Sequence, residues 1–426
     1  MIQLNRLTAP DRKIIKNLSL PELIQVKLDN NIDLYLLEGG SQDVTKIDIY
    51  FPSGLVQAGK PLLASTTNNM LEEGTMSRSS AQISELFDYY GAYLGTNTSY
   101  HYSMVSLVTL TKYLDETLPL TAEIIRNPLF PDTELKIYLN KKRQEFLLDQ
   151  EKVKMLASRK FNEILFGEDH PYGMNVQLPM FNSIHRDDLI NFHQQYYSPK
   201  NCQIIVSGRP GKNYLSLLNS YLGNKNWESS SAIEVPFPDI KGSSKKKYSI
   251  EKMGALQAAL RIGKPIITKD HKDFKGLQVL NTILGGYFSS RLMTTIREEK
   301  GYTYGISSYL ASLKNSGFWV IATEVKNDVK EDAIGAIFVE MEKLRTTLIG
   351  PDELEIVKNF MLGDLLRNLD SPFSISDNIK GLLENNLDLS FYTQMVQVIN
   401  EITPESILNL AQKYLQPDSF YTVIAG

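Results

Sequence analysis

Cysteine is almost absent from this sequence of 426 residues, which contains only Cys202 and therefore cannot form an internal disulfide. The surrounding segment, CQIIVSG, is typical of a buried strand, where a free thiol is usually inert packing. No uninterrupted apolar run approaches the roughly 20 residues that a membrane-spanning helix needs. The first residues, MIQLNRLTAPDRKIIKNL, show no export signal, so we expect a cytoplasmic protein, or a periplasmic one if a signal peptide has been removed.

An excess of positive charge is also missing. Lys and Arg number 45 against 49 Asp and Glu, and the formal net charge is -4. This mild acidity offers no field for a polyanion, so nucleic acid is not an expected partner. Hydrophobic residues make up 42% and charged residues 22%, the balance of a folded globular protein, and the length suits two domains of roughly 200 residues each.

Histidine is scarce as well. A catalytic zinc needs three protein ligands, commonly two histidines one helical turn apart and a carboxylate, together with an acid that activates the bound water. No two of the five histidines are three or four residues apart; they are His101, His170, His185, His193 and His271. The sequence therefore lacks the usual histidine pair of a zinc peptidase.

An internal repeat is present. The segment IHRDDLINFHQQYYSPKNCQIIVSG, beginning at Ile184, matches ITPESILNLAQKYLQPDSFYTVIAG, beginning at Ile402, with a separation of 218 residues. Both segments predict a short helix, a proline that stops it, and an apolar strand that ends in glycine. Upstream, PDTEL and PDEL are 220 residues apart, and the glycines of YYGAYLGT and EKGYTYGI are 210 apart. Three ordered matches indicate a duplicated domain.

The duplication and the element pattern predict an α+β fold of two homologous domains. We place the domains at residues 1–223 and 248–426, joined by a linker over 224–247 that is rich in Ser, Pro and Lys. In each half, strand-like segments such as KIDIYF and LQAALRI precede or interleave with amphipathic helices. Each domain is expected to be a mostly antiparallel sheet with helices packed on one face.

The stretch LLASTTNNMLEEGT, residues 62–75, joins these features to a known family. Two α+β repeats, an LEEGT-like turn after a helix, and GEDHPYG about a hundred residues later resemble the pitrilysin/insulinase family of metallopeptidases, also called inverzincins. The family helix reads His-x-x-Glu-His, and in register with it this sequence has Ser65, Asn68 and Asn69. Neutral Ser and Asn side chains are poor zinc ligands, and Asn68 cannot act as a general base. The resemblance thus implies a degenerate motif and no metal in this chain.

The family's third ligand is a glutamate on a later helix. The resemblance carries that position to the segment KKRQEFLLDQE, where Glu145 is the nearest acid and a shift of one residue selects Phe146. Glu145 alone would not hold zinc, and a solvated helix face explains this residue better than a ligand role does.

The second half contains SSRLMTTIREEKGYTYGISS, residues 289–308. The resemblance implies that an arginine and a tyrosine seven residues apart act here, and they match Arg297 and Tyr304. A guanidinium can bind a substrate carbonyl or terminus, and a phenol can donate to an oxyanion. At the 210-residue offset the first half has Phe87 and Leu94, so the fold itself does not demand the pair. The alternative is that the arginine ends a helix and the tyrosine packs in a strand.

The resemblance therefore implies a non-catalytic subunit of a heterodimeric zinc peptidase. A zinc-bearing homologue would be the partner, Arg297 and Tyr304 would act in trans on its site, and unfolded peptides would be the substrates. The isolated chain could also form a homodimer. Two alternatives remain: a structural or peptide-binding protein without a catalytic role, and a zinc peptidase with an atypical metal site.

Overall fold

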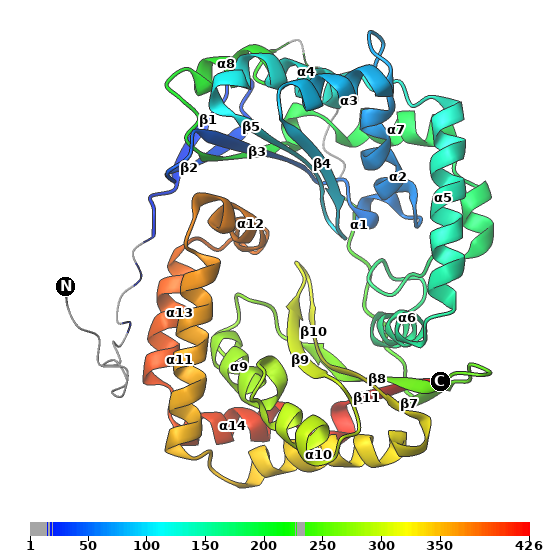
Figure 1. The fold of residues 1–426 in the computed structure, drawn as a ribbon, viewed down its shortest axis with the longest axis vertical. Helices are drawn as coiled ribbons and strands as arrows, with labels where there is room; N and C mark the ends of the chain where they lie inside the picture. Colours follow the sequence, from blue (N-terminus) through cyan, green and yellow to red (C-terminus); the bar gives the residue numbers. More distant parts are fainter. Residues whose placement is uncertain (1–14, 16–17, 19, 226, 228–234) are drawn as a thin grey trace, which may run out of the picture.

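The chain folds into two halves that face each other, each built on one β-sheet (Figure 1). The structure is a computed structural model and describes residues 15, 18, 20–225, 227 and 235–426. No helix within these residues is long and apolar enough to cross a membrane.

The first half contains a six-stranded sheet in the order β1-β2-β6-β3-β5-β4. All neighbouring strands are antiparallel except β2 and β6. The strands are β1 Ile24–Lys27, β2 Asp33–Glu38, β3 Val44–Phe51, β4 Tyr93–Thr98, β5 Ser103–Leu110 and β6 Gln203–Gly208. The helices are α1 Leu55–Ala58, α2 Leu63–Asn69, α3 Ser80–Tyr89, α4 Leu114–Arg126, α5 Asp132–Gln150, α6 Val153–Phe166, α7 Arg186–Tyr196 and α8 Tyr214–Tyr221.

The second half contains a five-stranded sheet in the order β7-β11-β8-β10-β9, again with one parallel pair, β7 and β11. The strands are β7 Lys247–Ile250, β8 Gln257–Ile266, β9 Ile306–Ser312, β10 Gly317–Lys326 and β11 Tyr421–Ala425. The helices are α9 Phe274–Asn281, α10 Lys330–Thr346, α11 Pro351–Asn368, α12 Pro372–Leu383, α13 Ser390–Glu401 and α14 Pro404–Tyr414. Two π-helical segments, Thr282–Gly286 and Met293–Glu299, lie between α9 and β9.

The two sheets share one topology, and the predicted α+β class is confirmed. The last strand of each half, β6 or β11, is inserted between a parallel neighbour and the long central strand, β3 or β8. The 218-residue offset found in the sequence superimposes these strands: Ile205 of β6 lies opposite Asp48, and Val423 of β11 lies opposite Arg261. Asp48 and Arg261 therefore occupy equivalent positions on the central strands.

Each half also lends one helix to the other, a feature that the sequence analysis did not foresee. Helix α6 of the first half packs on the second sheet, against β8 and β11, and α12 of the second half packs on the first sheet, against β2 and β6. Figure 1 shows α12 below the first sheet and α6 above the second. The helices are equivalent in the repeat, since Ser158 and Ser376 are 218 residues apart. One face of each sheet thus carries the helices of its own half, and the other face carries one exchanged helix.

The segment between the halves is part of the packing. Residues 226 and 228–234 of the predicted linker lie outside the described residues, and Lys247, also assigned to it, begins β7. Trp227 is buried in the first core, and residues 241–243 run beside α6, where the amide of Lys241 donates to Phe166 O at 3.3 Å and that of Ser243 to Ile164 O at 2.8 Å. The ring of Phe237 packs against His101, His170 and Tyr172. The hydroxyl of Tyr421 on β11 also donates to Ser243 O at 2.7 Å, so the crossing point is fixed against both halves.

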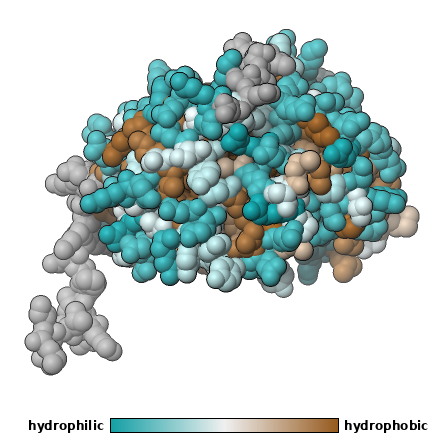
Figure 2. All heavy atoms as spheres, turned by 90° about the horizontal axis from the view of Figure 1, so that it is seen from above, coloured by the Kyte–Doolittle hydropathy of each residue, from teal (hydrophilic) through white to brown (hydrophobic). Residues whose placement is uncertain are grey.

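Seen from above, the molecule presents a mostly hydrophilic face with hydrophobic residues scattered over it (Figure 2). In Figure 1 this side carries α3, α4 and α8. Their apolar residues point inward: Leu118, Ile124 and Leu218 are buried in the core of the first half. This layer supports the first sheet from outside.

Candidate functional site

Helix α2 carries the three positions that the sequence aligns with a zinc motif, and it is anchored as a core helix. Leu63, Ala64 and Met70 are buried in the first core, and a 3-10 turn, Met70–Glu73, follows the helix directly. Packing of α2 against α7, β4 and β5 fixes where Ser65, Asn68 and Asn69 point.

Asn68, which the sequence resemblance places at the position of the water-activating glutamate, is fully buried, and both its amide nitrogen and its amide oxygen are hydrogen-bonded. Its amide nitrogen donates to Asn97 O at 2.9 Å and to Met104 O at 3.1 Å, and its amide oxygen accepts from the hydroxyl of Tyr197 at 3.0 Å. An amide can serve donors and acceptors at once, whereas a carboxylate could only accept. The residue ties α2 to the first sheet and has no free atom for a water molecule.

The side chain of Asn69, which the sequence resemblance places at a ligand position, is hydrogen-bonded in the same way. Its nitrogen donates to Ser65 O at 2.7 Å and to the hydroxyl of Tyr138 at 3.0 Å, and its oxygen accepts from Thr96 at 2.8 Å. The Ser65 hydroxyl donates to Leu62 O at 3.2 Å. The donor set of the family is thus replaced by neutral groups with internal partners, and these residues do not fit zinc.

A cavity of about 490 Å³ opens beside Asn69, between α2, α3, β4 and α5. Helix α5 contributes Tyr138, Lys141 and Lys142 to its wall. Glu145, the acid nearest the third ligand position, is exposed one turn further along α5, and its carboxylate lies 2.8 Å from Lys142 Nζ. Phe146, the other register, is buried and packs against Phe181 at 5.5 Å between ring centroids. Neither residue lines the cavity.

Glu72 and Glu73 close one end of this cavity. Burial, assisted by the negative charge of Glu73, raises the pKa of Glu72 to about 7. Glu73 accepts a hydrogen bond from Ser80 at 3.0 Å. Phe87 and Leu94, the first-half equivalents of Arg297 and Tyr304, are buried and also line the cavity. No group of three or more His, Cys, Asp and Glu that could hold a metal is found in the described part of the chain.

Arg297 and Tyr304 lie in the second half, on the π-helical segment and on the loop before β9. The guanidinium of Arg297 stacks over the ring of Phe288, with its carbon 4.7 Å from the ring centroid. Phe288 was not singled out from the sequence, although its exposure of 64% marks it as unpacked. Within the described residues no ion pair engages Arg297, and no hydrogen bond or ring contact joins it to Tyr304.

Tyr304 is 95% exposed, so it is not packed in a strand as the alternative interpretation held. The loop below it is held in place by Thr303, whose hydroxyl donates to Glu324 O at 2.7 Å and accepts from the amide of Gly305 at 3.1 Å. Gly301 opens the loop with φ of 64°, a left-handed conformation that favours glycine. The phenol is thus carried on an anchored loop but has no packing role of its own.

Comparison with known proteins agrees with this description. Residues 58–166 match the family Insulinase (Peptidase family M16), and residues 183–361 match the Peptidase M16 inactive domain. The chain belongs to the M16 insulinase family.

Individual relatives agree with this assignment. The chain is similar to the uncharacterized zinc protease YmxG of Bacillus subtilis, with 26% identity over 84% of this chain and 86% of the relative. It is also similar to the non-peptidase homolog YmxG of Helicobacter pylori, with 27% identity over 72% and 71%. The crystal structure of a peptidase M16 inactive domain from Pseudomonas fluorescens shares the fold, with a TM-score of 0.84, 22% identity and coverage of 95% and 98%.

Proposed function

We propose that this chain is a non-catalytic M16 subunit that pairs with a zinc-bearing homologue and helps it to bind and cleave peptides. The proposal rests on one observation about α2: the polar side-chain atoms of Asn68 and Asn69 are hydrogen-bonded to other residues of the same chain. A chain built in this way has no use for its own metal. Zinc would reside on the partner, and a peptide would be held between the two chains.

Arg297 and Tyr304 are the groups that we assign to the partner's reaction. Tyr304 is almost fully exposed, and Arg297 is half-buried with no ion pair among the described residues, so both polar groups can meet a substrate. In the pair, Arg297 would bind a peptide carbonyl or terminus, and Tyr304 would donate to the oxyanion that forms when water attacks. Both interactions strengthen as charge develops in the transition state.

The test is peptide hydrolysis by the purified pair. We expect Arg297→Ala and Tyr304→Phe to lower kcat about 10²–10³-fold, the usual cost of removing one preorganised donor. Lys300→Ala and Tyr309→Phe, which alter an exposed cation and a tyrosine on β9 of the same half, serve as matched controls. Hydrolysis that is unchanged by both Arg297→Ala and Tyr304→Phe would remove the role in trans.

A second function deserves the same assay. Relatives named a non-peptidase homolog and a probable inactive metalloprotease favour a purely structural or peptide-binding role. In that case the chain would bind its partner or a peptide, and neither substitution would affect turnover. A zinc peptidase with an atypical site, which the name zinc protease of other relatives suggests, would instead show stoichiometric zinc and cleavage by this chain alone.

A further inference from the structure

The two contacts made by the exchanged helices differ in kind. The α6 contact is a large apolar cluster with 12 buried residues among those described, including Phe161, Phe166 and Val423. The chain also crosses from one half to the other at this place, where residues 241–243 run beside α6. On the α6 side, the two halves are therefore joined both by the polypeptide chain and by apolar packing.

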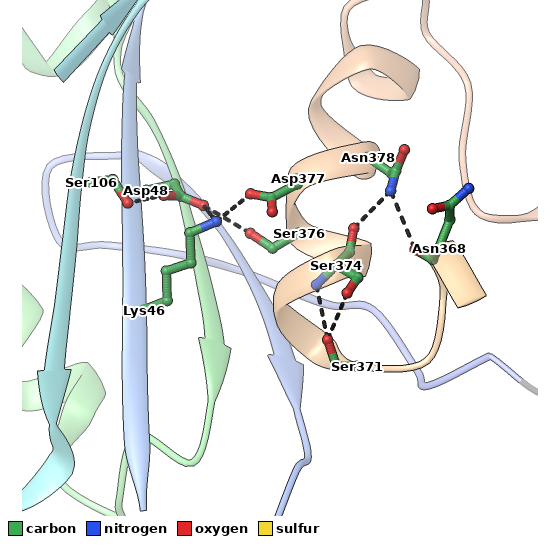
Figure 3. Close-up of polar contacts among 9 residues, drawn as sticks. All are labelled: Lys46, Asp48, Ser106, Asn368, Ser371, Ser374, Ser376, Asp377 and Asn378. Atoms are coloured by element: carbon green, nitrogen blue, oxygen red, sulfur yellow. Dashed lines mark hydrogen bonds and ion pairs between the residues drawn. The ribbon is translucent and has the colours of Figure 1, made fainter. Parts of the chain in front are cut away.

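The α12 contact has a smaller apolar cluster of seven buried residues, among them Tyr50 and Ile379. Charged groups lie within it. Asp48 is fully buried on β3 and accepts hydrogen bonds from Ser106 at 2.6 Å and from Ser376 of α12 at 2.8 Å (Figure 3). Lys46 Nζ lies 3.1 Å from the Asp48 carboxylate and is also paired with Asp377 of α12.

More charges surround this contact. Lys380 of α12 lies over the rings of Tyr50 and Tyr102, at 4.4 and 4.7 Å from their centroids, and pairs with Glu384 at 3.5 Å. Lys269 and Lys314 also interact electrostatically with Glu384. Because Asp377 is 66% exposed, its attraction to Lys46 is open to screening by salt. The first turn of α12 is fixed by Ser371, which accepts from the amide of Ser374 at 3.1 Å.

The equivalent site on the α6 side has the opposite charge, and its hydrogen-bond partner on the exchanged helix is a neutral hydroxyl. Arg261, the counterpart of Asp48, donates to Ser158 of α6 at 3.1 Å, and its nearest acid, Glu324, is on the same sheet at 3.7 Å. No ion pair within the described residues joins Arg261 to α6. Among the described residues, an ion pair between a sheet and an exchanged helix is thus found on the α12 side, whereas the α6 side has the Arg261 hydrogen bond and a cation–π contact of Lys160 with Tyr248 at 5.2 Å.

We infer that the two halves form a hinge and a latch: the α6 contact is the hinge, and Asp48, Lys46, Ser376 and Asp377 are the latch that holds α12 on the first sheet. Weakening the latch releases α12 from the inner face of the first sheet while α6 stays on the second sheet. The inference does not depend on a catalytic partner.

Hydrogen exchange of the full chain, read separately for α6 and α12, tests the inference. We expect Asp377→Asn to speed exchange of α12 amides several-fold and Asp48→Asn to speed it at least tenfold, with α6 amides unchanged in both. NaCl at 1 M should speed α12 exchange in the unaltered chain and add little in Asp377→Asn. Glu331→Gln, which breaks an exposed pair with Lys247 inside the second half, is the matched control and should leave α12 as it was.

Two results would overturn the latch. One is α12 exchange that stays the same in Asp377→Asn and Asp48→Asn; the other is equal acceleration of α6 and α12, which would mean general loosening. If Asp48→Asn does not fold, the result for Asp377→Asn decides alone. That substitution replaces a largely exposed carboxylate and leaves the buried carboxylate of Asp48 unchanged.

Discussion

The hydroxyl of Tyr197 on the loop after α7 donates a 3.0 Å hydrogen bond to the amide oxygen of Asn68 on α2. Asn68 stands at the position that the resemblance to the family assigns to the glutamate that activates water. The side chain at this position is instead a buried connection between a helix, a sheet and the chain after α7. The loss of the motif is therefore accompanied by a structural use of the position.

Removing this connection should cost stability. Asn68→Ala removes one hydrogen-bond partner each from the Tyr197 hydroxyl and from the carbonyls of Asn97 and Met104. We expect a loss of about 2–4 kcal/mol in the free energy of unfolding, because three buried or partly buried hydrogen bonds are lost at once. Urea unfolding measures the change. Asn378→Ala, on an exposed part of α12, is the control, and equal losses in the two variants would contradict this role of Asn68.

Restoring the family residues should not restore the metal site. The triple variant Ser65→His/Asn68→Glu/Asn69→His places two imidazoles and a carboxylate on α2. Helix α5 still contributes Tyr138 and Lys142 to the wall of the cavity. We expect no stoichiometric zinc and no cleavage, since a zinc site needs a third protein ligand. Metal analysis after equilibration with Zn²⁺ measures this. Adding Lys142→Glu to the triple variant should increase its affinity for zinc. Stoichiometric, tightly bound zinc in the triple variant itself would contradict this prediction, because another residue would then have to supply the third ligand.

The acid beside this cavity predicts a pH effect. Burial raises the pKa of Glu72 to about 7 from the model-peptide value of 4.5, so the folded chain holds a proton that the unfolded chain releases. The contribution of Glu72 to stability is present below pH 4.5 and is lost as the pH rises through 7. The change in the free energy of unfolding caused by Glu72→Gln should therefore be more favourable at pH 8 than at pH 4. Urea unfolding at both values checks this, with the exposed Glu85→Gln as control; a pH-independent effect of Glu72→Gln would be inconsistent with the raised pKa.

The sequence predicted the repeat and the element pattern well, because Pro199 and Pro417, or Gly208 and Gly426, mark equivalent boundaries in both copies. It could not predict the exchange of α6 and α12. An apolar helix face shows that a helix is buried, but not which of two similar sheets covers it. The partners of Asn68 were hidden for a related reason, since Asn97, Met104 and Tyr197 are 29 to 129 residues away along the chain.

The stacking of Arg297 on Phe288 gives a further prediction. If the ring holds the guanidinium ready for a peptide, Phe288→Ala should lower kcat of the assembled pair about 2–5-fold, the value of an exposed cation–π contact. Phe288→Trp should retain activity, because it keeps an aromatic face. Steady-state kinetics at saturating peptide measure kcat apart from binding. Equal activity in Phe288→Ala and the unaltered pair would show that Arg297 needs no such support.

The most direct measurement of the central claim compares peptide hydrolysis and zinc content for this chain alone, for a zinc-bearing M16 homologue alone, and for their equimolar mixture. We expect no stoichiometric zinc and no cleavage for this chain, and cleavage by the mixture well above that of the homologue. Zinc-dependent cleavage by this chain alone, or a mixture no more active than the homologue, would contradict the claim.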